Sequence, residues 1–111
     1  MVNQGDIIKI NFNPQQGHEQ AGYRPAIVIS NNFFNKISGF AIVCPITNTN
    51  RNFPLRIKLD DRTATTGDIL CDQVRSLDIN ARGFNFVEKL PEDLLQKVLL
   101  VTISEIEYWN S

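Results

Sequence analysis

The sequence predicts a mainly β fold, a small antiparallel β-barrel packed by one C-terminal helix. Several short apolar or alternating segments are separated by polar loops rich in glycine, proline and asparagine, a pattern typical of antiparallel β domains. From Pro91 onward the apolar spacing changes to that of an amphipathic helix. The 111 residues are enough for one hydrophobic core and too few for two, so residues 1–111 are expected to form a single domain.

The first two strands are expected at 7–12 and 26–29. Residues 7–12 alternate with a period of two, which predicts a half-buried strand. The polar stretch 13–22 contains proline and glycine breakers and is expected to be a loop. Residues 26–29 are continuously apolar and mostly β-branched, which predicts a buried strand. Pro25 has no N–H to donate, so it belongs at the start of that strand or at a sheet edge.

A short helical turn is expected after the second strand. Residues 30–32 can cap a turn that carries two phenylalanines, and Gly39 ends it. The apolar run 40–44 then predicts a third strand, which stops at Pro45.

Three further strands are expected at 55–59, 69–74 and 84–87. In the first of these, Arg56 and Lys58 alternate with apolar residues and are expected to form a solvated face. Polar, turn-rich residues predict loops at 47–52 and 60–67.

The last element is expected to be a helix that begins near Pro91, a residue suited to the first helical turn. Glu92 and Asp93 favour the positive end of the helix dipole. The positions at helical spacing are Leu94, Leu95, Val98, Leu99, Thr102, Ile103 and Ile106.

The overall composition excludes several classes of protein. Apolar residues make up 42% and charged residues 21%, as in soluble globular proteins. The formal net charge of −1 argues against a polycation that binds duplex nucleic acid by charge alone. The charge is uneven, because residues 1–82 hold all six arginines, with nine basic against seven acidic side chains. An anionic partner is therefore expected in that part of the chain.

The sequence has no stretch of about 20 apolar residues and no basic, apolar signal segment at its start, so a cytoplasmic protein without a membrane span is expected. Cys44 and Cys71 lie in apolar runs and are expected to be buried free thiols. With one histidine and no paired ligand spacing, no metal site is expected.

The segment 17–26 is the richest in chemistry. It gathers the imidazole of His18, the carboxylate of Glu19, the amide of Gln20 and the guanidinium of Arg24 just before a buried strand. A rigid strand that presents a polar loop is a common way to position reacting groups. Taken alone, His18 and Glu19 are better explained as an exposed loop pair.

Two other segments place polar groups at strand ends, at 45–48 and 72–78. Together these three segments resemble the MazF/PemK family of toxin endoribonucleases. The matching pieces are Gly5–Ile8, Gly17–Ala26, Phe34–Asn35, Pro45–Thr47, Asp72–Leu77 and Ala81–Arg82. The resemblance implies an SH3-like barrel with a C-terminal helix, as in the PemK and CcdB toxins, and a homodimer that needs no cofactor. It also implies metal-independent cleavage of single-stranded RNA, inhibition of translation and growth, and neutralisation by a cognate antitoxin.

The same resemblance assigns roles to the site residues. The ribose 2′-OH attacks phosphorus and leaves a 2′,3′-cyclic phosphate and a 5′-hydroxyl. Arg24 matches the residue that stabilises phosphate charge and is a candidate proton donor. Thr47 matches the catalytic threonine, and Glu19 matches a carboxylate that acts as base or holds Arg24.

Two further positions match the PemK-like branch of the family. His18 matches a residue that stabilises the phosphate, and Asp72 matches a general base. Leu70 stands where that branch carries a catalytic arginine, two residues before the aspartate. The scheme built on Arg24 and Thr47 is therefore favoured over one built on Asp72.

RNA contacts are expected from the loops around this site, because single-stranded RNA is read by stacking and by bonds to base edges. Tyr23 and Phe53 are candidates for stacking, although core or dimer packing explains Phe53 equally well. Residues expected to read bases or meet phosphates are Gln20, Asn35, Asn48, Gln73, Ser76, Arg51 and Arg75.

Two alternatives remain open from the sequence. One is a CcdB-like inhibitor of DNA gyrase, which shares the fold and acts through the end of its last helix, where this chain has Tyr108 and Trp109. The other is an RNA-binding barrel without chemistry. For the toxin reading, an acidic and partly disordered antitoxin suits the arginine bias of residues 1–82.

Overall fold

The computed structural model describes residues 1–14, 16–49 and 53–109. It contains seven strands in one curled antiparallel sheet, in the order β4-β5-β3-β2-β1-β7, with β6 paired to β3. The elements are β1 (Asp6–Asn11), β2 (Tyr23–Val28), α1 (Asn32–Ser38), β3 (Phe40–Thr47), β4 (Arg56–Lys58), β5 (Asp68–Leu70), β6 (Arg75–Asp78), α2 (Ile79–Arg82), β7 (Asn85–Lys89) and α3 (Glu92–Ser104). The predicted mainly β fold with a C-terminal helix is confirmed.

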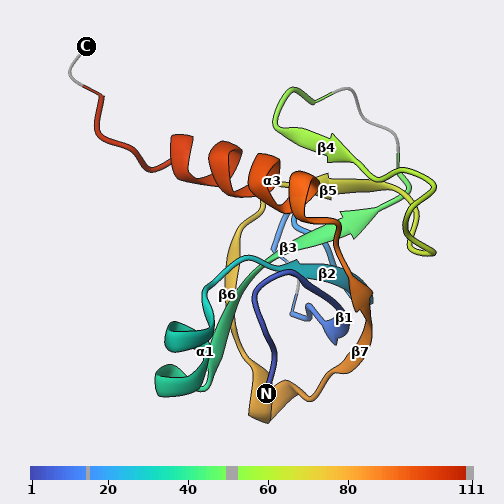
Figure 1. Cartoon of the computed structure of the whole chain (residues 1–111). Coiled ribbons are helices and arrows are strands. Elements are labelled where there is room, and N and C mark those ends of the chain that lie inside the picture. The colour runs from blue at the N-terminus through green and yellow to red at the C-terminus, as the bar shows by residue number, and fades with distance from the viewer. Residues whose placement is uncertain (15, 50–52, 110–111) are drawn as a thin grey trace.

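Helix α3 runs across one side of the sheet, while α1 and α2 lie at the opposite end of the molecule (Figure 1). Residues that alternate along the central strands enter two different hydrophobic clusters. Ile7 joins the cluster that contains Leu94 and Val98 of α3, whereas Ile8 and Ile10 join the other. The first strand was expected to be half-buried, and this is confirmed, because Lys9 and Asn11 of β1 are exposed. Ile7 is the exception on that face, since it is buried in the cluster beneath α3.

The third strand continues through Pro45, where the sequence predicted that it would stop. Pro45 pairs with Ala26 of β2, and β3 then extends to Ile46 and Thr47, which pair with β5. Thr47 therefore belongs to the sheet and is held at the end of a buried strand. Its backbone position is fixed by the same ladder that forms the core.

The expected strand over 69–74 is instead two strands, β5 and β6, joined by a turn at 71–74. Both strands pair with β3, at different positions along it. The backbone N–H of Gln73 donates to the carbonyl of Leu70 at 3.0 Å and closes the turn. Asp72 and Gln73 therefore lie in a turn and not in the strand pairing, and their side chains can contact neighbouring segments.

The helices follow the expected capping rules with two differences. Asn31 caps α1 by accepting from the backbone N–H of Phe34, and Gly39 ends it in the left-handed conformation at φ 72°. Pro91 lies just before α3 at its N-cap and not within its first turn. The short α2, capped by Asp78, was not predicted, because four residues are too few to show helical periodicity.

Two residues expected on the packed face of the last helix are solvent-exposed. Ile103 is 54% exposed, and α3 ends at Ser104, before Ile106, which is 84% exposed. Leu94, Val98 and Thr102 form the buried stripe instead. Within the described residues, no helix is long and apolar enough to cross a membrane.

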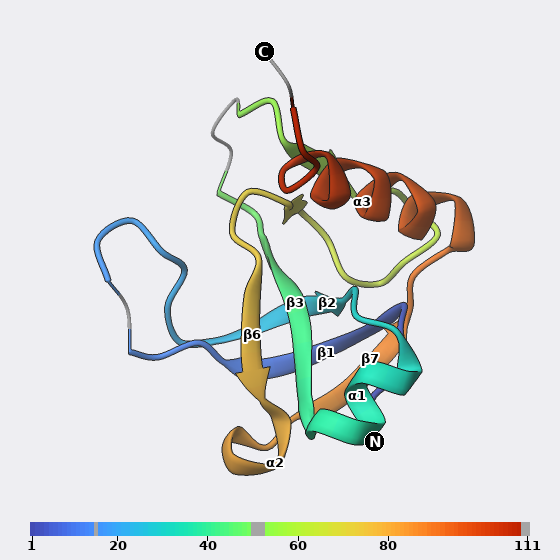
Figure 2. The same cartoon turned by 90° about the vertical axis from the view of Figure 1, so that its left-hand side faces the viewer.

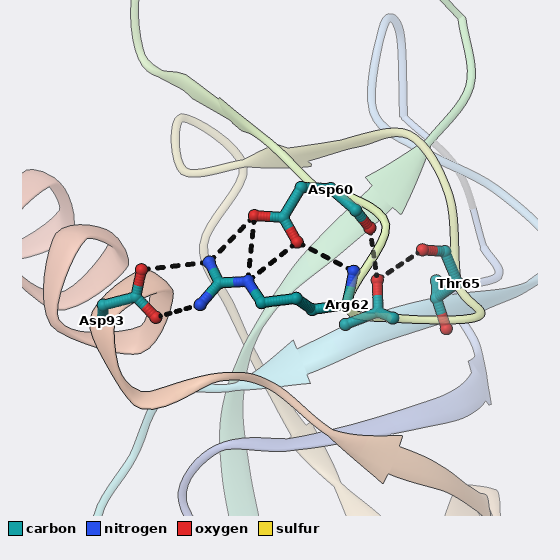
Figure 3. A network of polar contacts seen from close by, with 5 residues as sticks. Asp60, Arg62, Thr65 and Asp93 are labelled. Carbon is teal, nitrogen blue, oxygen red and sulfur yellow. Dashed lines mark hydrogen bonds and ion pairs between the residues drawn. The ribbon is translucent and has the colours of Figure 1, made fainter.

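The loop between β4 and β5 is fastened to α3 through Arg62 (Figure 3). Its terminal nitrogens donate to both carboxylate oxygens of Asp93, at 2.8 and 3.0 Å, and Nη2 also donates to Asp60 at 2.8 Å. On the other side of the loop, Glu88 of β7 accepts from the backbone and hydroxyl of Thr65. The loop is therefore held to α3 at Arg62 and to β7 at Thr65.

The two cysteines are buried free thiols, as predicted. A hydrogen bond to Cys71 and burial in the core both raise the pKa of the Cys44 thiol. Both thiols belong to the cluster between the sheet and α3. Their neutral forms pack there as small apolar side chains.

Candidate functional site

A hollow of about 260 Å³ opens where the loop between β1 and β2 meets the end of β3. Figure 2 shows this loop extending away from the sheet. The residues that line the hollow are Gly17, His18, Glu19, Gln20, Ala21, Arg24, Thr47, Thr49, Arg56 and Gln73. Five segments that are separate in the sequence therefore contribute to one polar surface.

Arg24 lies on β2, opposite Ile10 of β1, and its side chain is half-buried. The Nε–H donates to the carbonyl oxygen of Ala21 at 2.6 Å. This bond ties the guanidinium to the base of its own loop. Because Pro25 follows directly and Ala26 is buried, the backbone beneath Arg24 has little freedom. The residue is presented on a rigid strand.

Thr47 is the last residue of β3 and is only 4% exposed, yet it borders the hollow. Its hydroxyl oxygen accepts from the backbone N–H of Thr49 at 3.2 Å. Gly67 packs directly against its backbone, since a Cβ built on Gly67 would lie 2.3 Å from the carbonyl oxygen of Thr47. Gly67 also has φ +114°, so any side chain there is both strained and obstructed.

The loop residues His18, Glu19 and Gln20 border the hollow from the other side. His18 and Glu19 are exposed, so each belongs to the hollow while remaining in contact with solvent. A carboxylate oxygen of Glu19 accepts from the backbone N–H of Gln16 at 3.1 Å. The backbone N–H of Gln20 donates to the side-chain oxygen of Gln73 at 3.0 Å, which joins this loop to the 71–74 turn.

Arg56 is the site residue that sequence reasoning missed. It was expected on a solvated strand face, but its side chain is only 10% exposed and borders the hollow. Its Nε contacts a carboxylate oxygen of Asp72 at 3.4 Å, and its guanidinium lies 5.3 Å from the centre of the Phe53 ring. The residue opposite it across the β4–β5 pair is Leu70. A single sequence contains no signal for that pairing.

Asp72 does not border the hollow. Its carboxylate contacts the Nε of Arg56, which does border it. The C-terminal end of α3 also approaches this region. Burial, together with the negative charge of Asp72, raises the pKa of Glu105 above its ordinary range. Asp72 thus has a cation and a further carboxyl group among its neighbours.

A second and larger hollow, of about 810 Å³, adjoins the first at Thr47 and Arg56. Asn48 and Phe53, two of the expected RNA contacts, line it. Its other lining residues are Lys58, Leu59, Asp60, Asp61, Thr63, Thr66, Gly67 and Asp68. Its carboxylates make it less suited to a phosphate backbone than the smaller hollow, which gathers two arginines.

Several expected RNA contacts lie elsewhere. Asn35 is only 3% exposed, and its amide donates to the carbonyl of Ser30 at 3.1 Å, so the prediction that it reads bases is wrong. Arg75 borders neither hollow and donates instead to the carbonyl of Phe12 at 2.7 Å, which anchors the start of the site loop.

Two more candidates are exposed but lie outside both hollows. Ser76 lies on β6 opposite Ile42, and Tyr23 begins β2 with its hydroxyl beside the Asn85 amide. Arg51 lies outside the described residues. Among the residues that the structure describes, no group of three or more metal-ligating side chains gathers at any point.

The fold and the site together define a small antiparallel barrel with a C-terminal helix and a polar hollow lined by two arginines. The chain belongs to the PemK-like, MazF-like toxin family of type II toxin–antitoxin systems, which it matches over residues 3–102.

Individual relatives agree with this membership. Endoribonuclease PemK of Escherichia coli is 34% identical over 102 residues, which cover 88% of this chain and 77% of that protein. The crystal structure of MazF from Deinococcus radiodurans superposes with a TM-score of 0.89 at 33% identity, covering 96% of this chain and 97% of that one. A MazE–MazF structure from the same organism gives a TM-score of 0.83 at 32% identity and covers 97% of both chains.

Proposed function

We propose that this chain is the toxin of a type II pair and a sequence-specific endoribonuclease that cuts single-stranded RNA without a metal ion. One observation carries the proposal: Arg24 and Thr47, 23 positions apart in the sequence, border a single solvent-open hollow with His18 and Glu19. The family membership and the endoribonuclease names of relatives such as PemK support it.

The proposed reaction is an internal transesterification followed by strand release. The ribose 2′-oxygen forms a bond to the adjacent phosphorus while its proton passes to a base. The bond from phosphorus to the 5′-oxygen breaks, and that oxygen takes up a proton. The products are a 2′,3′-cyclic phosphate and a 5′-hydroxyl, so no oxidant, reductant or further reactant is required. The site must therefore supply charge stabilisation and two proton transfers.

Arg24 is assigned to the non-bridging phosphate oxygens. Its Nε–H is already occupied by the carbonyl of Ala21, which leaves the two terminal nitrogens for a ligand. A guanidinium stays charged and can hold two phosphate oxygens at once. Charge on those oxygens grows in the transition state, so a prepositioned cation there accelerates the chemistry. Arg24 is also the candidate donor of a proton to the leaving oxygen.

The other proposed roles follow from position around the hollow. The Thr47 hydroxyl retains its proton for a bond to the phosphate, because it already accepts from the N–H of Thr49. Glu19 is the candidate base, since its carboxylate borders the hollow and is exposed. His18 lies beside it and is assigned to stabilising the phosphate.

The bases of the RNA are proposed to contact the rims of both hollows. Gln20 and Gln73 belong to the rim of the smaller hollow, whereas Asn48 and Phe53 line the larger one. Phe53 is 49% exposed and can stack on a base. Tyr23 and Ser76 are too far around the surface to share these rims and are proposed as contacts of an extended strand only.

The proposed partner is an antitoxin that covers this surface. Structures of related toxins include MazE–MazF complexes, which supports a cognate antitoxin for this chain. An acidic peptide would match the two arginines of the smaller hollow. We also propose that the chain acts as a homodimer in the cytoplasm.

The decisive experiment is digestion of a long RNA that contains unpaired segments, in excess EDTA, followed by mapping of both new ends. We expect cuts at a short recurring sequence, with 2′,3′-cyclic phosphate and 5′-hydroxyl ends. Arg24 supplies the positive charge at the phosphate, so chelation should leave the rate unchanged. Loss of cleavage in EDTA that a divalent ion restores, or ends bearing a 5′-phosphate, would contradict the mechanism.

The alternative of a gyrase inhibitor is not supported. Relatives that cover most of this chain are named endoribonucleases, including PemK and MazF of Escherichia coli. In the same digestion, an RNA-binding barrel without chemistry would protect RNA and release no new ends.

A further inference from the structure

The two arginines of the smaller hollow are held in the same way. Arg24 gives its Nε–H to a carbonyl oxygen, and Arg56 gives its own to the carboxylate of Asp72. Neither arginine uses its terminal nitrogens in any hydrogen bond to the described residues. No fully buried side-chain nitrogen or oxygen there lacks a partner, so these terminal nitrogens reach solvent in the hollow.

The contact between Arg56 and Asp72 is unlike a structural ion pair. It is a single contact of 3.4 Å through Nε. Elsewhere in this molecule, Arg62 binds Asp93 through two parallel bonds of 2.8 and 3.0 Å, the geometry expected when an ion pair fastens two segments. Asp72 therefore orients the guanidinium of Arg56 but leaves its two-pronged end open.

Because most of the Arg56 side chain is buried, its charged end contacts solvent only through the hollow. The Arg56 side chain is 10% exposed, with the ring of Phe53 on one side and Leu70 as its cross-strand neighbour. Taking a charge out of water is unfavourable, and one long contact to Asp72 compensates for it only partly. An anion in the hollow would complete the coordination, and the apolar neighbours would strengthen that interaction by lowering the local dielectric.

We propose that Arg56 binds the scissile phosphate of the RNA together with Arg24, and that Asp72 is a positioning residue that orients Arg56. The inference rests on the proposed function and adds a second guanidinium to its site. Both arginines border the same hollow, so their open ends can meet different oxygens of one phosphodiester. Two forked cations match the charge that builds on two non-bridging oxygens during attack.

The first test replaces Arg56 while preserving its packing. Arg56→Met keeps an unbranched apolar stem of similar reach, and we expect kcat/KM for RNA cleavage to fall by at least about 100-fold. Arg56→Lys keeps the charge, but its single ammonium cannot bind Asp72 and present a fork, so we expect less than about a tenth of the wild-type rate. Lys36→Met, which removes an exposed charge on α1 outside both hollows, should cleave normally.

The second test separates positioning from general-base catalysis. In Asp72→Asn the amide oxygen still accepts from the Arg56 Nε–H, so we expect a rate within about tenfold of wild type and an unchanged acidic limb of the pH–rate profile. Asp72→Ala removes the acceptor and should cost more. The groups facing Asp72 are Arg56, Glu105 and the Cys44 thiol, and all three are unaltered in these variants.

A third measurement does not require turnover. An RNA with a 2′-O-methyl group at the mapped cleavage point cannot react, and its affinity for Arg56→Met should depend less steeply on salt, with the logarithmic slope reduced by about 1.

The outcomes distinguish this inference from the proposed function. If the wild-type chain releases no new RNA ends, the proposed function fails. If wild type cleaves and Arg56→Met or Arg56→Lys cleaves within twofold of it, the role of Arg56 fails alone. If Asp72→Asn loses as much activity as Arg56→Met, together with the acidic limb, Asp72 is the base and the positioning role is overturned. If Arg56→Met does not fold, the rates of Arg56→Lys, Asp72→Asn and Asp72→Ala still test the proposed roles of Arg56 and Asp72.

Discussion

At the scale of single residues, the smaller hollow combines groups on strands with groups on an exposed loop. Arg24 and Thr47 are carried by strands of the sheet, whereas His18 and Glu19 are exposed on a loop. Groups that stabilise charge must be prepositioned to be effective, while a base can tolerate more freedom. The distribution of these four residues agrees with the roles proposed for them.

Replacement of Arg24 by alanine should therefore separate activity from folding. We expect Arg24→Ala to lower RNA cleavage by at least about 100-fold, because a prepositioned cation at the phosphate is lost. Its melting temperature should stay close to that of wild type, since the half-buried side chain contributes one bond to its own loop. Lys9→Ala removes an exposed cation on the neighbouring strand and serves as control. Equal cleavage by the two variants would remove Arg24 from the mechanism.

At the scale of elements, the site exists because β3 changes partners along its length. Its first residues, 40–43, pair with β6, and its last residues, 46–47, pair with β5. Residues 43–45 pair with β2. The turn between β5 and β6 falls where β3 passes from one partner to the other. That turn contributes Gln73 to the hollow and directs Asp72 toward Arg56.

The loop that follows β4 depends on the ion-pair network of Arg62 (Figure 3). Hydrogen bonds from Arg62 lower the pKa of Asp60 and that of Asp93. A carboxylate with a lowered folded-state pKa stabilises the fold above its unfolded-state pKa, and this contribution is lost as the pH falls through the folded-state value.

We therefore expect Arg62→Met to lower the melting temperature by a few degrees at pH 7, and by progressively less as the pH falls below about 3.8, the ordinary pKa of aspartate. The network is exposed, so added salt should also reduce the difference. Thermal melts followed by circular dichroism at pH 7 and pH 3 provide the measurement, with Lys36→Met as control. A difference that is equally large at both pH values would assign the effect to packing of the Arg62 stem.

Comparison of particular elements shows what the sequence could predict. Alternation and β-branching correctly located the strands around residues 8, 27 and 42. Both patterns reflect which side chains of a strand are buried, and this can be read from the strand's own sequence. Strand pairing depends on contacts between distant segments, and this is where the predictions failed. The passage of β3 through Pro45 and the split at 71–74 both arise from pairing.

The same limit explains the site residues. The segment 17–24 and Thr47 were found because their residues match a family pattern. Arg56 was missed because only its register with Leu70 turns it toward Asp72. Asn35 was misassigned because its buried bonds to Ser30 cannot be read from its neighbours in the sequence.

At the scale of the whole molecule, the exposed side of α3 is unusually apolar. Leu100 is 69% exposed and Ile103 54% exposed, and Ile106 follows just beyond the helix. Apolar side chains gathered on one helix face favour association over solvation. This supports the proposed homodimer, although the helix is already packed on the sheet through its other side.

Measurement of the molecular mass in solution tests that proposal. We expect sedimentation equilibrium to give twice the chain mass of 12.6 kDa, and Leu100→Asp with Ile103→Asp to shift the mass toward that of one chain. Gln96→Asp, an exposed substitution on α3 that adds one of the two negative charges without removing an apolar side chain, is the control. A wild-type mass of one chain at micromolar concentration would contradict the homodimer.

The tight packing of Gly67 beneath Thr47 has a consequence for how such a protein can be silenced. A toxin gene under selection for survivors accumulates lesions wherever a single nucleotide change disables the product. At position 67 every replacement introduces a Cβ that must displace the carbonyl end of the third strand, and with it the Thr47 side chain that borders the smaller hollow. Escape mutants should therefore recur at this glycine, which carries no chemical group of its own.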